Sequence, residues 1–141
     1  MKNVKKLNAV MLIDDNEIDN LINQKMIESI NMSDNIFIHS GAKSALEYLK
    51  NIEKIKDGAP KFLPELIFLD IDMPIMDGFQ FIDEFEKLSN DTKEYCKIIM
   101  LTSSLDPKDI TKSKKNKYIL KYLNKPLTQE SLIKFAETDA E

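Results

Sequence analysis

Two stretches of the sequence carry an unbroken apolar run directly into acidic residues. Leu66–Leu69 is followed by Asp70. An earlier run, residues 9–13, is followed by Asp14 and Asp15. Carboxylates held close together repel one another and raise each other's pKa values, and a hard divalent cation such as Mg²⁺ relieves this repulsion. An aspartate is also a known phosphoryl acceptor. These residue types therefore predict a metal-assisted site, provided that the fold brings the two acidic stretches together.

Two further predicted strands lead to side chains that suit the same chemistry. Residues 98–101 lead into Thr102, which offers a hydroxyl, and residues 118–123 lead to Lys125, which offers an ammonium group. A metal, a carboxylate nucleophile, a hydroxyl and an ammonium make up the inventory for phosphoryl transfer, in which positioning and charge stabilisation do most of the catalysis. The chain has three glycines and no glycine-rich loop, so we expect a phosphoryl donor other than a tightly bound nucleotide.

The elements that must position these side chains can be read from the hydrophobic pattern. Continuous apolar runs are typical of strands buried on both faces of a sheet. The expected strands are residues 9–13, 36–38, 66–69, 98–101 and 118–123. Helices are expected between and after them. Their apolar stripes are Ile18, Leu21, Ile22, Met26 and Ile30; Ala42, Ala45, Leu46, Leu49 and Ile52; Phe79, Ile82, Phe85 and Leu88; a weak stripe over 108–117; and Leu132, Ile133, Phe135 and Ala136.

The fivefold alternation of strand and helix predicts an α/β fold. Parallel strands joined by helices form a doubly wound sheet with helices on both faces and right-handed crossovers. We expect the flavodoxin-like order 2-1-3-4-5 for this five-stranded parallel sheet, because it makes strands one and three neighbours. In such sheets, ligands bind outside the carboxyl ends of the strands. The acidic residues, Thr102 and Lys125 are therefore expected to meet in one crevice.

Length and composition indicate one globular domain. The chain has 141 residues, of which 43% are apolar, and a net charge of -4, which argues mildly against nonspecific nucleic-acid binding. It has no apolar run of membrane-spanning length and no signal-peptide core, so a cytoplasmic location is expected. Cys96 and His39 are the only residues of their kinds. An internal disulfide is therefore impossible, and a histidine-based zinc site or a catalytic triad has little to build on.

Four motifs together resemble the receiver domain of response regulators in bacterial two-component systems. They are Asp14-Asp15, Leu69-Asp70-x-x-Met73-Pro74-x-Met76-Asp77-Gly78, Leu101-Thr102-Ser103 and Tyr122-Leu123-x-Lys125-Pro126. Each motif alone is weak, but their order and spacing together are specific, and the resemblance extends over residues 9–135. The chain is similar to single-domain, chemotaxis-regulator-like proteins of this family.

The resemblance implies a phosphoacceptor and a metal site. Asp70 would accept the phosphoryl group. Asp15 would bind Mg²⁺ (or Mn²⁺) directly, and Asp14 would be a second ligand. The Asp70 carboxylate and the backbone carbonyl of Asp72 would complete the protein's share of the ligands.

The resemblance also implies a phosphoryl-binding and switching group. Lys125 would pair with a phosphoryl oxygen, Thr102 would hydrogen-bond the attached phosphoryl group, and Ser103 would offer its amide. Tyr122 corresponds to the aromatic residue that turns inward when the threonine hydroxyl is drawn to the phosphate. The face made by the fourth helix, the last strand and the last helix would then change shape.

The implied function is signalling by phosphoryl transfer. A sensor histidine kinase or a histidine phosphotransfer protein would donate its phosphoryl group, and the output would be partner binding or a phosphorelay. The protein would then catalyse only its own phosphorylation and dephosphorylation. We expect residues 8–137 to form the receiver domain, with residues 1–7 and 138–141 as tails. No DNA-binding or other output domain and no membrane association are expected, and the protein should be a monomer or weak dimer.

Two features depart from the common pattern of the family. The loop over residues 56–64 is longer than usual, and Asp72 occupies a position that in the family tunes the lifetime of the phosphoryl group. The fourth helix is basic, because residues 106–125 contain seven lysines and two aspartates. An acidic partner surface and a solvated helix face are both open interpretations of that charge.

Three alternatives remain at this point. The acidic residues could be ordinary loop and cap residues. Asp70-Ile71-Asp72 also fits an aspartate-nucleophile phosphatase of the haloacid-dehalogenase type, with Asp72 as the general acid. Those enzymes, however, need later metal carboxylates and usually a cap insertion, which this chain lacks. The third alternative is an unphosphorylated interaction module.

Overall fold

The computed structural model describes residues 6–55 and 62–133. The tail at residues 1–5, most of the loop at 56–64, and Phe135 and Ala136 of the last expected helix lie outside this part of the chain. The strands are β1 (Val10–Ile13), β2 (Ile36–His39), β3 (Leu66–Leu69), β4 (Lys97–Thr102) and β5 (Ile119–Asn124). The helices are α1 (Glu17–Ser29), α2 (Ala42–Glu53), α4 (Gly78–Phe85), α5 (Asn90–Tyr95) and α6 (Pro107–Lys115).

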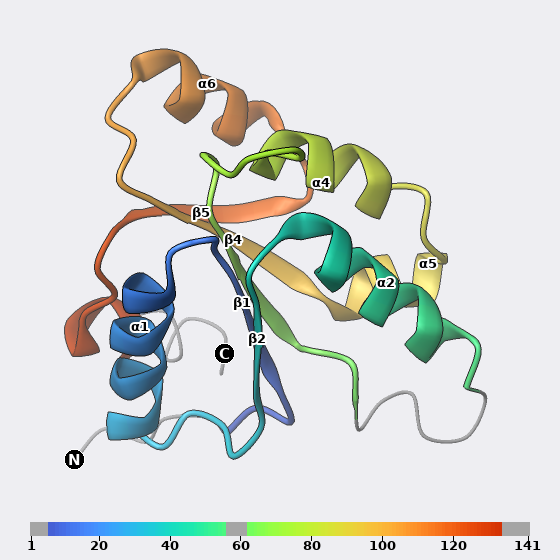
Figure 1. Cartoon of the computed structure of the whole chain (residues 1–141), viewed down its shortest axis with the longest axis horizontal. Helices are drawn as coiled ribbons and strands as arrows, with labels where there is room; N and C mark the ends of the chain where they lie inside the picture. Colours follow the sequence, from blue (N-terminus) through green and yellow to red (C-terminus); the bar gives the residue numbers. More distant parts are fainter. Residues whose placement is uncertain (1–5, 56–61, 134–141) are drawn as a thin grey trace.

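The five strands form one parallel sheet in the order β2-β1-β3-β4-β5, as predicted (Figure 1). The register pairs Ile13 of β1 with Leu69 of β3, so the two strands end side by side. The amide of Asp70 continues the ladder by donating to the Ile13 carbonyl at 3.1 Å. The first acidic residues after β1 and β3 therefore leave the sheet at the same level.

The central strands are buried on both faces, which explains their continuous apolar sequences. In β1, β3 and β4, alternate residues enter two separate cores. One core, beneath α2 and α4, receives Met11, Ile13, Ile67, Leu69, Ile98 and Met100. The other, beneath α1, receives Val10, Leu12, Leu66, Phe68, Ile99 and Leu101. Figure 1 shows α1 on one side of the sheet and α2 with α4 on the other. The sheet is thus a rigid support for the residues that follow its strands.

The described chain is anchored before β1 begins. Leu7 is buried, and its amide donates to the Met32 carbonyl at 2.7 Å. Leu7 also forms an isolated bridge with Ser33. Lys6 pairs with Asp34 at 2.9 Å. These contacts tie the residues before β1 to the connection between α1 and β2.

The predicted apolar stripe of α1 is wrong in its first half. Ile18, Leu21 and Ile22 are 69%, 53% and 42% exposed. The face that the helix buries carries Asn20, Asn23 and Ile27 instead. Met26 and Ile30, the rest of the predicted stripe, do pack partly against the core. The helix is rotated away from its apolar stripe because its asparagine amides bind backbone groups inside the protein.

The third expected helix is also shorter than predicted. It ends at Phe85, so Leu88 lies beyond it, although Leu88 is still buried. A separate short helix, α5, follows. Ser89 caps α5 by accepting a hydrogen bond from the Thr92 amide at 3.3 Å. Helix α5 was not predicted, because its six residues are mostly polar and too few to display an apolar stripe.

Helix α6 packs weakly, in agreement with its thin apolar stripe. Its one fully buried side chain is Ser113, whose hydroxyl has no hydrogen-bond partner within the described residues. Ile110 is only half-buried. Asp106 caps the helix at the Lys108 amide, at 2.9 Å, and Pro107 is its first residue. The capping defines where α6 begins, but little apolar area holds it against the sheet.

Candidate functional site

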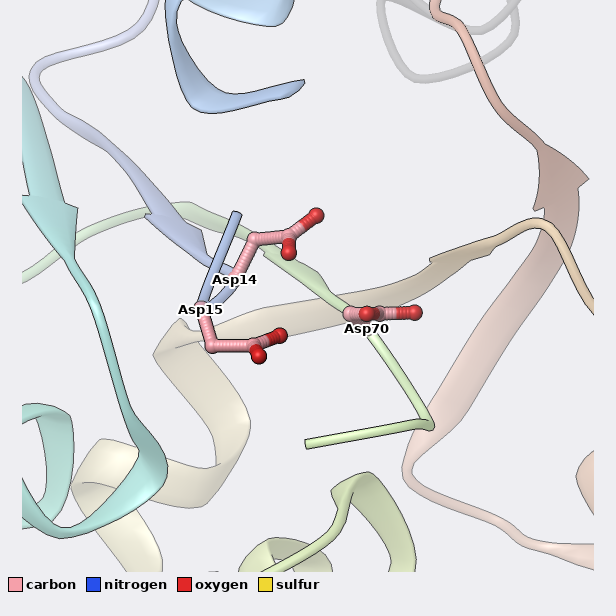
Figure 2. A group of neighbouring side chains, drawn as sticks. All are labelled: Asp14, Asp15 and Asp70. Carbon is pink, nitrogen blue, oxygen red and sulfur yellow. The ribbon is translucent and has the colours of Figure 1, made fainter. Parts of the chain in front are cut away.

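The carboxyl ends of β1 and β3 bring three aspartates together. Asp14, Asp15 and Asp70 each offer a carboxylate oxygen, and these oxygens lie within 4.8 Å of one another (Figure 2). Asp14 and Asp70 are buried, whereas Asp15 is exposed. The cluster therefore combines two buried carboxylates with one that is exposed to solvent.

Lys125 reaches this cluster from the end of β5. Its Nζ lies 2.6 Å from Asp14 Oδ2 and 3.3 Å from Asp70 Oδ2. A third carboxylate, Asp19 of α1, lies 2.9 Å from the same nitrogen. The backbone amide of Lys125 donates to the Thr102 carbonyl at 2.9 Å, which extends the β4–β5 pairing to the edge of the site. Four elements thus contribute to one ion-pair network.

The charges of this network perturb its members. Burial raises the pKa of Asp70, and the nearby Asp14 acts in the same direction, whereas Lys125 and the Thr102 hydroxyl oppose them. Burial by itself would lower the pKa of Lys125, but its hydrogen bonds to Asp14 and Asp19 reverse the sign, and the net shift is upward. A single ammonium therefore faces more carboxylates than it can neutralise. Such an excess of hard oxygen ligands suits a divalent cation.

The loop after β3 folds tightly against Asp70. The amide of Gly78 donates to the Ile71 carbonyl at 2.9 Å. A Cβ at position 78 would lie 2.5 Å from the Asp70 carbonyl oxygen, so only glycine permits this approach. Asp77 then starts α4 through a capping box with Gln80. The segment of residues 70–78 is fixed at both ends.

Thr102 and Tyr122 are connected through the residue Ser104. Thr102 is fully buried, and its Oγ1 accepts a hydrogen bond from the Ser104 amide at 3.2 Å. The hydroxyl of Tyr122 donates to the Ser104 carbonyl at 2.9 Å. Ser103, which lies between Thr102 and Ser104 in the sequence, is exposed. Asp72 is also exposed, and its charge adds to burial in raising the pKa of Tyr122. Thr102 and Tyr122, the two residues expected to form the switch, therefore both bind the backbone of Ser104 in the loop after β4.

Three residues of this region were missed by sequence reasoning. Asp19 pairs with Lys125, and Asn20 donates from its side-chain amide to the Asp14 carbonyl at 2.8 Å. Asn23 accepts from the Leu127 amide at 3.1 Å. The one available signal was the position of Asp19, one helical turn after Asp15. Asn20 and Asn23 gave no signal, because asparagine in a helix usually faces solvent.

Comparison with known proteins identifies the family. The sequence model of the response regulator receiver domain matches residues 10–137. The chain belongs to this family. It is accordingly a receiver domain of two-component signalling, and its fold and the four motifs agree with that assignment. Among the described residues, no helix is long and apolar enough to cross a membrane.

Solved structures and curated proteins support the assignment. A two-component response regulator from Cytophaga hutchinsonii is 28% identical, with a TM-score of 0.85 over 97% of this chain and 100% of that chain. The probable methanogenesis regulatory protein FilR2 of Methanothrix harundinacea is 24% identical over 91% of this chain and 78% of its own length. The Mn²⁺-bound form of response regulator Rcp1 has the same fold, with 22% identity and a TM-score of 0.67 over 92% of this chain and 89% of that chain.

Proposed function

We propose that this receiver domain accepts a phosphoryl group on Asp70 from a phosphohistidine of a sensor histidine kinase or a histidine phosphotransfer protein. The observation that carries the proposal is the position of Asp70 Oδ2, 3.3 Å from Lys125 Nζ and within the three-aspartate cluster. An Asp70 oxygen would attack phosphorus, and the phosphorus–nitrogen bond to the donor imidazole would break. The imidazole nitrogen keeps the electron pair of that bond.

A divalent cation, Mg²⁺ or Mn²⁺, fits the donor set. Asp14, Asp15 and Asp70 supply only oxygen atoms, which are the ligands that these cations prefer. The backbone carbonyl of Asp72 is a further candidate ligand. The Mn²⁺-bound form of Rcp1, a protein with the same fold, supports this part of the proposal. The cation would neutralise negative charge between the aspartates and the incoming phosphoryl group.

Other residues would hold the phosphoryl group and transmit its presence. We expect Lys125, the Thr102 hydroxyl and the Ser103 amide to bind its oxygens. A movement of Thr102 toward the phosphoryl group would disturb its hydrogen bond with Ser104, and Tyr122 binds the same residue. Since α6 buries so little apolar area, a shift of the surface formed by α6, β5 and the last helix should cost little.

The donor protein would dock beside the acidic site. The exposed side chains Ile18, Leu21 and Ile22 lie on the solvent face of α1, the helix that also supplies Asp19 to the site. Exposed apolar patches of this kind commonly mark protein interaction surfaces. This face of α1 therefore supports a protein donor rather than a small metabolite as the natural source of the phosphoryl group.

The proposal is tested by intact-mass measurement after incubation with Mg²⁺ and acetyl phosphate. Wild type should gain one phosphoryl group, and Asp70→Asn should gain none. Asp34→Asn is the matched control, because it removes an exposed aspartate that pairs with Lys6 far from the cluster. Its uptake should equal that of wild type.

Other outcomes would redirect the proposal. Uptake by Asp70→Asn would move the acceptor to another carboxylate. Steady release of inorganic phosphate, abolished in Asp70→Asn and without a mass gain in wild type, would favour a phosphatase. If wild type shows no phosphoryl uptake and no phosphate release, the phosphoacceptor function is contradicted, and the interaction module remains.

A further inference from the structure

The ammonium group of Lys125 has no donor left for a further ligand. A lysine ammonium carries three N–H donors. Three carboxylates surround Nζ: Asp14 at 2.6 Å, Asp19 at 2.9 Å and Asp70 at 3.3 Å. A phosphoryl oxygen that binds Lys125 must therefore displace or compete with one of these carboxylates.

Asp19 differs from the other two partners in its origin and its exposure. It belongs to the first turn of α1, where its own amide donates to the cap residue Asn16 at 3.0 Å. Its side chain is 33% exposed, whereas those of Asp14 and Asp70 are 6% exposed. Water can thus solvate a released Asp19 carboxylate, while a released Asp14 carboxylate would remain buried and poorly solvated.

We propose that Asp19 is a positioning residue that competes with the incoming phosphoryl group for Lys125 and so restrains phosphorylation of Asp70. This inference rests on the proposed function. Asp19 holds one N–H of Lys125 at a shorter distance than Asp70 does, and it adds a negative charge that repels an anionic donor. Both effects weaken binding of the donor before any bond changes.

The chemistry itself stays with Asp70. With acetyl phosphate, an Asp70 oxygen attacks phosphorus, the bond between phosphorus and the acetyl oxygen breaks, and acetate leaves with the electron pair. Asp19 touches none of these atoms and acts only through Lys125. Its removal should therefore act mainly on the donor concentration needed for half-maximal rate, and less on the maximal rate.

The test is the rate of phosphoryl uptake, followed by intact mass over a series of acetyl phosphate concentrations at constant ionic strength and Mg²⁺. Asp19→Asn should lower the half-saturating donor concentration by about two- to fivefold, the range expected for loss of one partly exposed charged contact. Asp19→Ser removes the same ion pair with a smaller side chain and should behave alike. Asp19→Glu keeps the charge and should restore a value near that of wild type.

Glu17→Gln is the matched control, because Glu17 is the other acidic residue in the first turn of α1. It should leave the half-saturating concentration unchanged. An equal decrease in Glu17→Gln would overturn the inference by pointing to a general charge effect. Unchanged or higher values in both Asp19→Asn and Asp19→Ser, with wild type taking up phosphoryl normally, would overturn the role of Asp19 alone. Failure of wild type to take up phosphoryl would overturn the proposed function and this inference together.

Discussion

The position of Asp70 depends on a neighbour without a side chain. Because the Cβ of an alanine at position 78 would lie 2.5 Å from the Asp70 carbonyl oxygen, the backbone of residues 70–78 would have to move. We predict that Gly78→Ala lowers the free energy of unfolding by about 1–3 kcal/mol, as overpacking against a rigid backbone does. It should also slow phosphoryl uptake from acetyl phosphate. Urea denaturation and intact mass measure the two effects.

Gly41 provides the control for that prediction. It precedes α2 in an extended conformation, and a Cβ there would meet no atom within 4 Å. Gly41→Ala should change stability by less than about 1 kcal/mol, the usual scale for a cap position, and should leave uptake unchanged. Equal losses in the two variants would mean that the close approach of Gly78 to Asp70 is unimportant.

His39 predicts a pH dependence of stability. The ring is half-buried, and its Nδ1 atom lies 2.7 Å from Ser44 Oγ. Burial lowers the pKa of His39 below the ordinary value of 6.5. Between the lowered pKa and 6.5, the unfolded chain binds more protons than the folded protein, so stability falls as the pH decreases through this range. We expect wild type to lose more stability than His39→Gln as the pH falls from 7.5 to 5.5. Parallel losses in urea denaturation would contradict this.

At the residue scale, the sequence predicted which residues form the site better than it predicted their contacts. Asp14, Asp15, Asp70 and Lys125 were found because each follows a predicted strand, and the carboxyl ends of parallel strands lie at one edge of the sheet. Asp19 was missed because its partner lies 106 residues away in the sequence, and nothing local distinguishes it from an ordinary first-turn acidic residue. Long-range ion pairs depend on the packing of helices, which a local pattern does not specify.

At the scale of elements, α1 supplies a direct comparison between sequence pattern and packing. Ile27 is fully buried, whereas Leu21 of the predicted stripe is 53% exposed. We predict that Ile27→Ala lowers the free energy of unfolding by about 2–5 kcal/mol, and that Leu21→Ala changes it by less than about 0.5 kcal/mol. Urea denaturation of the two variants measures the difference. The reverse order would show that the helix packs on its predicted stripe.

The strands were more predictable than the helices for a physical reason. A strand buried on both faces needs apolar residues at every position, so its sequence is unmistakable. A helix needs only one buried face, and in α1 that face uses asparagines that bind backbone groups. Helix α5 is too short to display any periodicity. The thin stripe of α6 was recognised correctly because its lysines leave few positions that could be buried.

At the scale of the whole molecule, binding of a metal at the acidic site would be coupled to stability. A ligand that binds only the folded protein raises the free energy of unfolding in proportion to the logarithm of its concentration once the site is saturated. We predict that Mg²⁺ raises the thermal midpoint of wild type at constant ionic strength. Asp15→Asn should reduce the shift, whereas Asp34→Asn should retain it. Equal shifts in all three proteins would indicate a general charge effect instead of a site.

The strand order was predictable because the site chemistry and a common order of doubly wound sheets both make the first and third strands neighbours. Only an order that makes the first and third strands neighbours brings Asp14 close to Asp70, and the sheet has that order. The rotation of α1 and the contacts of Asp19 followed from neither requirement. They depend on how the helices pack against the sheet, which the strand order does not determine.

The burial of Cys96 at the amino end of β4 makes this protein a convenient host for a spectroscopic reporter. Cys96 is the only cysteine, and burial raises its pKa to about 12, so its thiol should resist alkylation at neutral pH. A cysteine introduced at the exposed position Lys115, at the end of α6, would then be the one reactive thiol. A fluorophore attached there would test in real time whether α6 moves on phosphorylation, without first removing the native cysteine.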